Sequence, residues 1–316
     1  MMARERVMLA GLGAVARAAR AAGLGRPLNV VRDGYDRAFL ALGRPPLRGR
    51  IEGLAFRGYL RHRSFLANGA RRGTSYVGLF TQALQPGLTV VDGGAHLGAY
   101  TVLAARAVGP RGCVLAFEPD AYNFAALAFN VRQLAGGRAR LSRRALAAAS
   151  GQADFHVSRG TLGTSLFARE DTGAVEVVET TSLDDELAGH DLDGGLLVKL
   201  NVEGAEALAL DGMRQTLGRA EDVVLFAEVH PSLLRAAGTD PAAFIGELER
   251  LGLYLSWIER STGSLSVVDE HCIDAHGHVL AVRLSGAQSG ARAEALRARP
   301  PRQRPIARAG RASRAS

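Results

Sequence analysis

The chain has 316 residues, and 47% of them are hydrophobic, which is enough to bury a large core. Its two cysteines are too few for a disulfide framework or a cysteine metal cluster, and this usage favours a reducing, cytoplasmic setting. The formal net charge is +8, but residues 291–316 contain eight arginines and one glutamate and so carry +7 of it. The rest of the chain is nearly neutral, which argues against a broad basic face for nucleic acid.

Residues 1–74 are predicted to form an N-terminal helical cap. Within them, residues 1–26 are rich in Arg, Ala, Leu and Gly and resemble an amphipathic helix that lies on the domain or makes weak contact with a membrane surface. Their apolar run is shorter than the roughly 20 residues that a transmembrane helix needs. Residues 27–87 are predicted to form short helices and turns, interrupted at Pro45 and Pro46.

From Leu88 onward, short apolar runs alternate with helical patterns, which predicts an α/β domain over residues 75–284 with a mostly parallel sheet. The first unit reads LTVVDGGAHLG, a strand over 88–91 followed by a glycine turn and a helix over 99–108. Further strands are predicted at 113–117, 139–141, 153–157, 175–180, 196–202, 223–229, 253–258 and 278–283, and further helices at 121–134, from 181, at 204–217 and at 241–251. The last two strands predict one antiparallel strand at the sheet edge.

The glycine turn and the acid that ends the next strand predict a nucleoside site, because ligands of such sheets bind at the carboxyl ends of the strands. Asp92, Gly93, Gly94 and Gly98 would form the turn, where glycine allows close backbone approach to a ligand. Glu118 would accept hydrogen bonds from the ribose hydroxyls. The spacing is looser than the G-x-G-x-x-G of a pyrophosphate binder, and the acid beside the turn favours a cationic ligand. The sequence therefore favours S-adenosylmethionine over a dinucleotide.

Polar residues at the next two strand ends are the catalytic candidates. Lys199, the only lysine, alternates with Asn201 and Glu203, which predicts that the three share one face of a strand. Lys199 is predicted to organise the carboxylates, the alternative being a purely structural ion pair with Glu203 or Glu228. Glu203 and His230 are the candidate proton acceptors.

No metal centre is predicted. The three histidines within residues 271–278 lack the spacing of a zinc site. A divalent cation held by oxygen atoms of Asn201, Glu203 and Glu228 is the alternative.

Four segments in matching order resemble the FkbM family of S-adenosylmethionine-dependent methyltransferases. They are VVDGGAHLGAYTVLAARAVGPRGCVLAFEPDAYNFAALAFNV, ETTSLDDEL, LLVKLNVEGAEALALDGM and LFAEVHP, and the resemblance spans about residues 75–260. It implies a class I methyltransferase fold, Rossmann-like, with a seven-stranded mostly parallel sheet and helices on both faces. It also implies that Asp92, Gly94 and Gly98 contact the methionine end of the cofactor and that Glu118 holds its ribose.

The resemblance implies methyl transfer to a hydroxyl of a sugar, glycan or natural-product small molecule. Lys199, Glu203 and Glu206 match the family signature K-x-D-x-E-G-x-E, although Glu206 is equally explained by the electrostatics of a helix start. His96 stands where the family usually has Asn, and Asn201 where it usually has Asp. The second change removes a carboxylate from the predicted catalytic face, so a catalytically impaired binding protein is one alternative function.

The other alternative is an RNA methyltransferase, supported by the arginine-rich tail alone. Residues 285–316 are predicted to be a disordered basic tail, and no nucleic-acid partner is expected for the folded domain. The sequence does not determine the oligomeric state.

Overall fold

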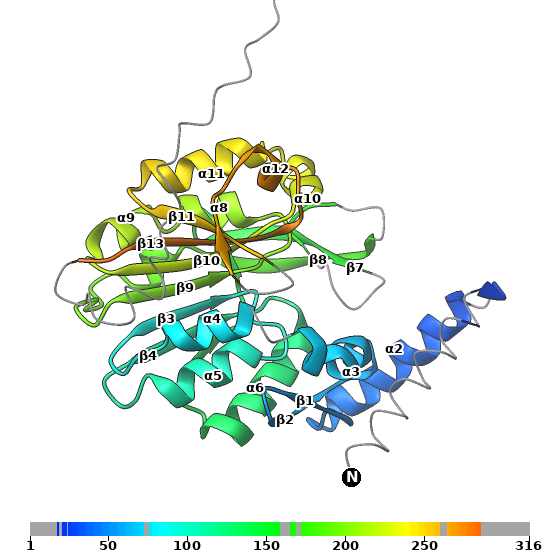
Figure 1. The fold of residues 1–316 in the computed structure, drawn as a ribbon. Coiled ribbons are helices and arrows are strands. Elements are labelled where there is room, and N and C mark those ends of the chain that lie inside the picture. Colours follow the sequence, from blue (N-terminus) through cyan, green and yellow to red (C-terminus); the bar gives the residue numbers. More distant parts are fainter. Residues whose placement is uncertain are drawn as a thin grey trace, which may run out of the picture.

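A computed structural model describes residues 18, 21–23, 25–72, 76–158, 165–168, 172–259 and 264–285. The predicted helix within residues 1–26 falls largely outside this part of the chain, and the basic tail falls outside it from residue 286 onward. The centre of the described part is an eight-stranded sheet with the order β12-β11-β13-β10-β9-β3-β4-β5 (Figure 1). Its strands are β3 (Thr89–Gly93), β4 (Cys113–Phe117), β5 (Arg140–Ser142), β9 (Leu196–Leu200), β10 (Val223–Val229), β11 (Tyr254–Ile258), β12 (Leu265–Ser266) and β13 (Gly277–Arg283).

Strands β5, β4, β3, β9 and β10 are mutually parallel. Strand β13 is antiparallel to both neighbours and lies between β10 and β11, so the predicted antiparallel edge strand is in fact interior. The edge is β12, a two-residue strand antiparallel to β11, which adds an eighth strand to the seven expected. Such a short pairing leaves no periodic pattern in the sequence.

Helices cover both faces of the sheet (Figure 1). One face packs against α4 (Tyr76–Ala83), α5 (Ala99–Ala107) and α6 (Ala121–Ala135). The other packs against α7 (Leu183–Glu186), α8 (Glu206–Asp211), α9 (Arg214–Arg219), α10 (Pro231–Ala236), α11 (Pro241–Arg250) and α12 (Glu270–Ile273). Successive strand residues alternate between the two cores: Val90 and Val224 belong to the first, Val91 and Val223 to the second. Because both faces are covered, the strands read as continuous apolar runs.

The helix α6 shows how closely the sequence determines some element ends. Asp120 caps its first turn by accepting hydrogen bonds from the N–H groups of Tyr122 and Asn123. Gly136 ends the helix in the left-handed conformation, at φ 63°. Both ends agree with the sequence prediction to within one residue.

A second, three-stranded sheet joins β6 (Ala145–Leu146), β8 (Thr172–Thr181) and β7 (Gly151–Ser158). Strands β7 and β8 are the predicted pair, and they are antiparallel and longer than expected.

The N-terminal part contains α2 (Gly25–Ala41), β1 (Leu47–Ile51), β2 (Leu54–Gly58), the 3₁₀ helix η1 (Leu60–His62) and α3 (Arg63–Arg72). Strands β1 and β2 form an antiparallel hairpin, so the prediction of helices and turns alone for residues 27–87 is wrong there. Glu52 and Gly53, at φ 46° and 76°, form the connecting turn. The hairpin was missed because glutamate is an uncommon residue at such a position and β1, with two arginines, has no clear apolar pattern.

Two other predicted elements differ in the structure: one strand is shorter than predicted, and one helix is divided into two. The strand expected over 196–202 stops at Leu200, because the chain turns into the left-handed region at Glu203 and Gly204. The helix expected over 204–217 is split into α8 and α9. At the break, a Cβ on Gly212 would lie 2.0 Å from the carbonyl oxygen of Ala147, so the backbones there approach too closely for a side chain.

Candidate active site

Asp92 and Lys199 form a buried pair beneath the glycine turn. They are register partners on the neighbouring strands β3 and β9, and Lys199 Nζ lies 3.2 Å from Asp92 Oδ1. Lys199 Nζ also donates to the carbonyl oxygens of Gly93 and Gly94, at 3.0 and 2.8 Å. The hydroxyl of Thr101 donates to Asp92 Oδ2 at 2.6 Å. The pair therefore holds the turn in place. The ion-pair partner of Lys199 is Asp92, and not Glu203 or Glu228, the two partners of the alternative interpretation.

The glycines of the turn are required by backbone contacts. Gly94 has φ 74°, and a Cβ there would lie 1.9 Å from the carbonyl oxygen of Asn201. Gly98 precedes α5 at φ 91°, and a Cβ there would lie 2.7 Å from a methyl carbon of Leu127. The turn thus packs directly on the loop after β9 and on α6. Contact of Gly93, Gly94 and Gly98 with a ligand stays a prediction.

Glu118 lies buried at the carboxyl end of β4, across from the turn. Its Oε2 accepts the backbone N–H of His96 at 2.7 Å. Its Oε1 accepts the backbone N–H of Asp120 at 3.0 Å and the side-chain amide of Asn123 at 3.2 Å. Burial and the nearby Asp120 charge raise its pKa to about 7, despite these hydrogen bonds. A carboxyl group whose pKa lies near ordinary pH is typical of a functional site.

His96 occupies the turn in the left-handed conformation, at φ 53°. Asn is the non-glycine residue best suited to that conformation, and His is also enriched there, so the substitution keeps the backbone course. The imidazole packs edge-on against the rings of His62 and Phe65, with centroids 5.0 and 4.8 Å away. The contact with Glu118 uses the backbone N–H, which any residue supplies.

The loop between β9 and α8 is closed by Glu206. Its two carboxyl oxygens accept the backbone N–H groups of Val202 and Gly204, each at 2.9 Å. Burial and the charge of Glu228 raise the pKa of Glu206 to about 8. Asn201 and Glu203, the latter at φ 56°, lie in this loop after the end of β9, so the prediction that they share one strand face with Lys199 is wrong. The Glu203 carbonyl accepts the hydroxyl of Ser165 at 2.7 Å.

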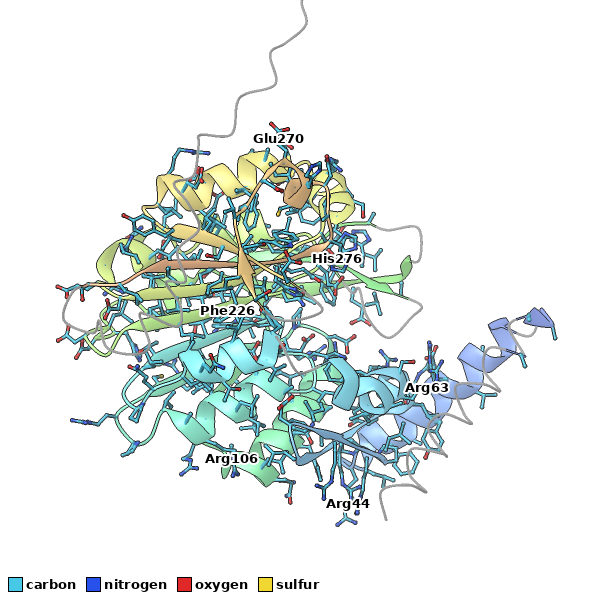
Figure 2. The ribbon with its side chains drawn as sticks, in the orientation of Figure 1. Arg44, Arg63, Arg106, Phe226, Glu270 and His276 are labelled. Carbon is cyan, nitrogen blue, oxygen red and sulfur yellow. The ribbon has the colours of Figure 1, made fainter. Side chains whose placement is uncertain are left out.

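A histidine cluster surrounds Glu228 at the end of β10. His276 Nε2 lies 2.8 Å from Glu228 Oε1, and the rings of His276 and His230 stack with centroids 4.2 Å apart. Figure 2 labels His276 at the edge of the sheet. Burial acts to raise the pKa of Glu228, but the hydrogen bond from His276 and the charges of His278, His276 and His230 outweigh it, and the pKa is lowered. His230 Nδ1 lies 3.1 Å from the hydroxyl of Ser232.

The sequence analysis missed the part that His276 and His278 play in this cluster. It considered them only as zinc ligands, because their proximity to Glu228 depends on the pairing of β13 with β10. Glu228 pairs with His278 and Val229 with Gly277, so the start of β13 meets the end of β10. The sequence offered one signal for this placement: His276 and His278 lie at the start of the strand predicted over 278–283.

The strand ends fit a ligand that carries cationic and hydroxyl groups. Asn201 Oδ1 and Glu228 Oε2 are buried acceptors with no hydrogen-bond partner among the described residues. Buried acceptors of this kind normally have a partner, so a ligand donor is a natural complement. Within the described ranges, no group of three or more His, Cys, Asp or Glu residues is arranged to hold a metal ion. Within those same ranges, no helix is both long and apolar enough to cross a membrane.

A sequence model of the methyltransferase FkbM domain family matches residues 92–253, which is just over half of the chain. The chain belongs to the FkbM methyltransferase family. The match covers the glycine turn, Glu118, the β9–α8 loop and the Glu228 strand end, so every site residue predicted from the sequence lies within it. As an FkbM methyltransferase, the protein is an enzyme that uses S-adenosylmethionine, and its sheet has the strand order of the class I fold.

The chain also has a distant similarity to solved structures, among them the following three. A precorrin-6y C5,15-methyltransferase from Geobacter metallireducens is 16% identical, with a TM-score of 0.34 over 65% of this chain and 83% of that one. An O-methyltransferase from Thermotoga maritima is 13% identical, with a TM-score of 0.35 over 66% and 64%. An rRNA methylase from Streptococcus thermophilus is 11% identical, with a TM-score of 0.35 over 66% and 93%. No curated protein matches the chain in a sequence comparison.

Proposed function

We propose that this methyltransferase acts on a hydroxyl group of a sugar, a glycan or a natural-product small molecule, in the cytoplasm. The observation that carries the proposal is the cluster of carboxylate and imidazole groups at the end of β10, where Glu228 and His230 of the matched FkbM domain contact His276, which follows that domain. Methylation of a hydroxyl requires removal of its proton, and side chains of this kind are the usual acceptors.

The cofactor is placed by two groups of residues in this proposal. Glu118 holds the ribose, and the glycine turn with Asn201 receives the methionine end. Asp92 has no exposed surface and acts through Lys199, by holding the turn in shape. When bound, S-adenosylmethionine supplies a methyl group on a positively charged sulfur, so the protein's task is to position the hydroxyl and take up its proton.

Glu203 and His230 are the proposed proton acceptors, and we propose His276 as a third because it contacts Glu228. All three lie in segments that follow or precede strands at the carboxyl edge of the sheet, and His276 is held by the buried carboxylate of Glu228. A buried carboxylate that hydrogen-bonds an imidazole orients the ring. Lys199 serves catalysis indirectly, by fixing the turn.

The test has two stages. Calorimetry first measures binding of S-adenosylmethionine to the full chain, and dissociation constants above the high micromolar range would refute the cofactor site. Methyl-labelled cofactor is then incubated with a panel of methyl glycosides, hydroxylated polyketides and total RNA. Label in the glycosides or polyketides supports the proposal, whereas label in RNA alone supports the RNA alternative. A further sample lacking residues 291–316 shows whether RNA labelling depends on the basic tail.

A catalytically impaired protein is the second candidate, favoured by Asn201. The variant Asn201→Asp restores the carboxylate of the family signature next to Gly94. If a missing carboxylate limits catalysis, the variant at saturating cofactor transfers methyl groups about 10-fold faster than the natural chain, or more. High activity before the change and no difference after it would show that position 201 is not catalytic.

A further inference from the structure

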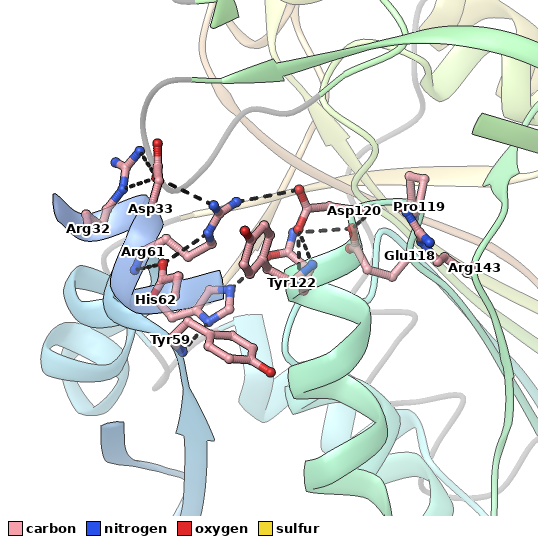
Figure 3. Close-up of polar contacts among 12 residues, drawn as sticks. Arg32, Asp33, Tyr59, Arg61, His62, Glu118, Pro119, Asp120, Tyr122 and Arg143 are labelled. Atoms are coloured by element: carbon pink, nitrogen blue, oxygen red, sulfur yellow. Dashed lines mark hydrogen bonds and ion pairs between the residues drawn. The ribbon is translucent and has the colours of Figure 1, made fainter. Parts of the chain in front are cut away.

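A buried histidine of the N-terminal segment is connected to the candidate ribose carboxylate. His62, in η1, has no exposed surface. Its Nε2 lies 2.8 Å from Asn123 Oδ1, and the amide nitrogen of Asn123 donates to Glu118 Oε1 at 3.2 Å. Residues from three separate elements therefore form one hydrogen-bonded chain (Figure 3).

The direction of each hydrogen bond in this chain is determined. The backbone N–H of Tyr59 donates to His62 Nδ1 at 2.9 Å, so Nδ1 is the acceptor nitrogen and Nε2 carries the hydrogen. Nε2 can then only donate to Asn123, which must turn its oxygen towards His62 and its NH₂ towards Glu118. Burial lowers the pKa of His62 to about 4, so the ring stays neutral and keeps this pattern at ordinary pH. His62 thus holds the Asn123 amide from the side opposite Glu118, in the orientation that presents its NH₂ to the carboxyl group.

Arg61 attaches the same segment to the first turn of α6. Its guanidinium lies 3.6 Å from the centre of the Tyr122 ring. It also makes ion pairs with Asp36, at 3.3 Å, and Asp120, at 3.8 Å (Figure 3). Because Asp120 caps α6, these contacts hold the turn that carries Asn123.

The other oxygen of Glu118 depends on the same segment. The His96 ring packs against His62 and Phe65, and the backbone N–H of His96 donates to Glu118 Oε2. Donors to both carboxyl oxygens are thus placed by contacts with His62.

We propose that His62 is a positioning residue of the cofactor site, which aims the carboxylate of Glu118 at the ribose through Asn123, so that the segment before β3 completes the ribose subsite. This inference rests on the proposed role of Glu118 in cofactor binding. It gives the His62 side chain, which precedes the matched family domain, a specific part in recognising the cofactor.

The test compares two probes, S-adenosylhomocysteine and its 2′-deoxyadenosyl analogue, by calorimetry on the full chain. In His62→Phe, S-adenosylhomocysteine should bind about 10-fold more weakly, because one charge-assisted contact is misplaced. Binding of the deoxy analogue should change less than two-fold, so the preference for the ribose hydroxyl is largely lost. Tyr59→Phe is the matched control: Tyr59 is equally buried, and its hydroxyl has no hydrogen-bond partner among the described residues. This control should bind both probes normally.

A second variant, Asn123→Ala, interrupts the chain without altering the N-terminal segment and should give the same loss of preference. The double variant should bind S-adenosylhomocysteine no more weakly than either single variant, because both changes act through Glu118. An unchanged preference in both folded single variants, or equal weakening of both probes, would overturn the inference in favour of a purely structural role. A natural chain that binds neither probe would instead refute the proposed cofactor site itself.

Discussion

At the scale of single residues, the central feature is that charged groups of the site are fixed to one another within the protein. Lys199 and Asp92 are both almost completely buried, and each is the other's charge partner. Removing one charge from such a pair leaves the other buried and uncompensated. Lys199 therefore belongs to the framework of the turn as much as to catalysis.

This pairing predicts the outcome of a double-mutant cycle. Lys199→Met should lower the free energy of unfolding by about 3–5 kcal/mol, because Asp92 stays buried without its partner. Lys199→Met combined with Asp92→Asn should cost clearly less than the sum of the two single changes. Urea denaturation measures all four proteins. Strictly additive losses would show that the two residues do not interact as a pair.

At the scale of elements, the turn after β3 and the loop after β9 form one unit. The backbone of Gly94 touches the carbonyl of Asn201, and the backbone N–H of Asn201 donates to the carbonyl of Gly93 at 3.1 Å. Two of the three non-glycine residues with positive φ in the described part, His96 and Glu203, lie in these two segments. Left-handed backbone at non-glycine residues is strained, and such strain is concentrated at functional sites.

The contact between the two segments is tested by Gly94→Ala, with Gly109→Ala as its control. Both glycines have positive φ, 74° and 67°, but a Cβ on Gly109 would meet nothing within 4 Å. Gly109→Ala should lower the free energy of unfolding only by the conformational penalty of about 1–2 kcal/mol. Gly94→Ala should lower the free energy of unfolding by about 4 kcal/mol or more, since backbone atoms must also move. Thermal and urea unfolding give both values, and equal costs would contradict the close contact.

At the scale of the whole molecule, folding buries two acids near the ends of parallel strands. Glu206 and Glu118 are buried with raised pKa values of about 8 and about 7, whereas their ordinary pKa is near 4.5. The folded chain therefore keeps protons that the unfolded chain releases, and stability falls as pH rises through this range. The lowered pKa of His62 has the opposite effect: between about pH 4 and 6.5 the unfolded chain binds more protons at this residue, so its contribution to stability rises with pH.

These shifts predict the pH dependence of stability between pH 6.5 and 8. The free energy of unfolding should decrease with rising pH, by at most about 1.4 kcal/mol per pH unit for each of the two acids. Glu206→Gln should flatten this slope, whatever its effect on absolute stability, because its share of the proton release is gone. Chemical denaturation at several pH values measures the slope. A natural chain whose stability rises across this window would contradict the prediction.

Much of the domain follows from the sequence. The apolar runs at 113–117 and 223–229 match β4 and β10 residue for residue, because both are buried on two faces and bounded by polar residues. The Asp120 cap and the Gly136 stop are local devices that any helix of this sequence would use. The glycine turn and the acids at strand ends were likewise identifiable, since each depends on a few adjacent residues.

Only the tertiary structure decided which of these groups contact each other. The pairing of β3 with β9 assigned Lys199 to Asp92, and the insertion of β13 beside β10 placed His276 on Glu228. The packing of η1 on α6 connected His62 to Glu118 through Asn123. Local sequence sets propensities and caps, so it determined most elements of the α/β domain, the cofactor class and the family. Contacts between residues 48 to 107 positions apart depend on strand order and helix packing, which no short pattern in the chain encodes.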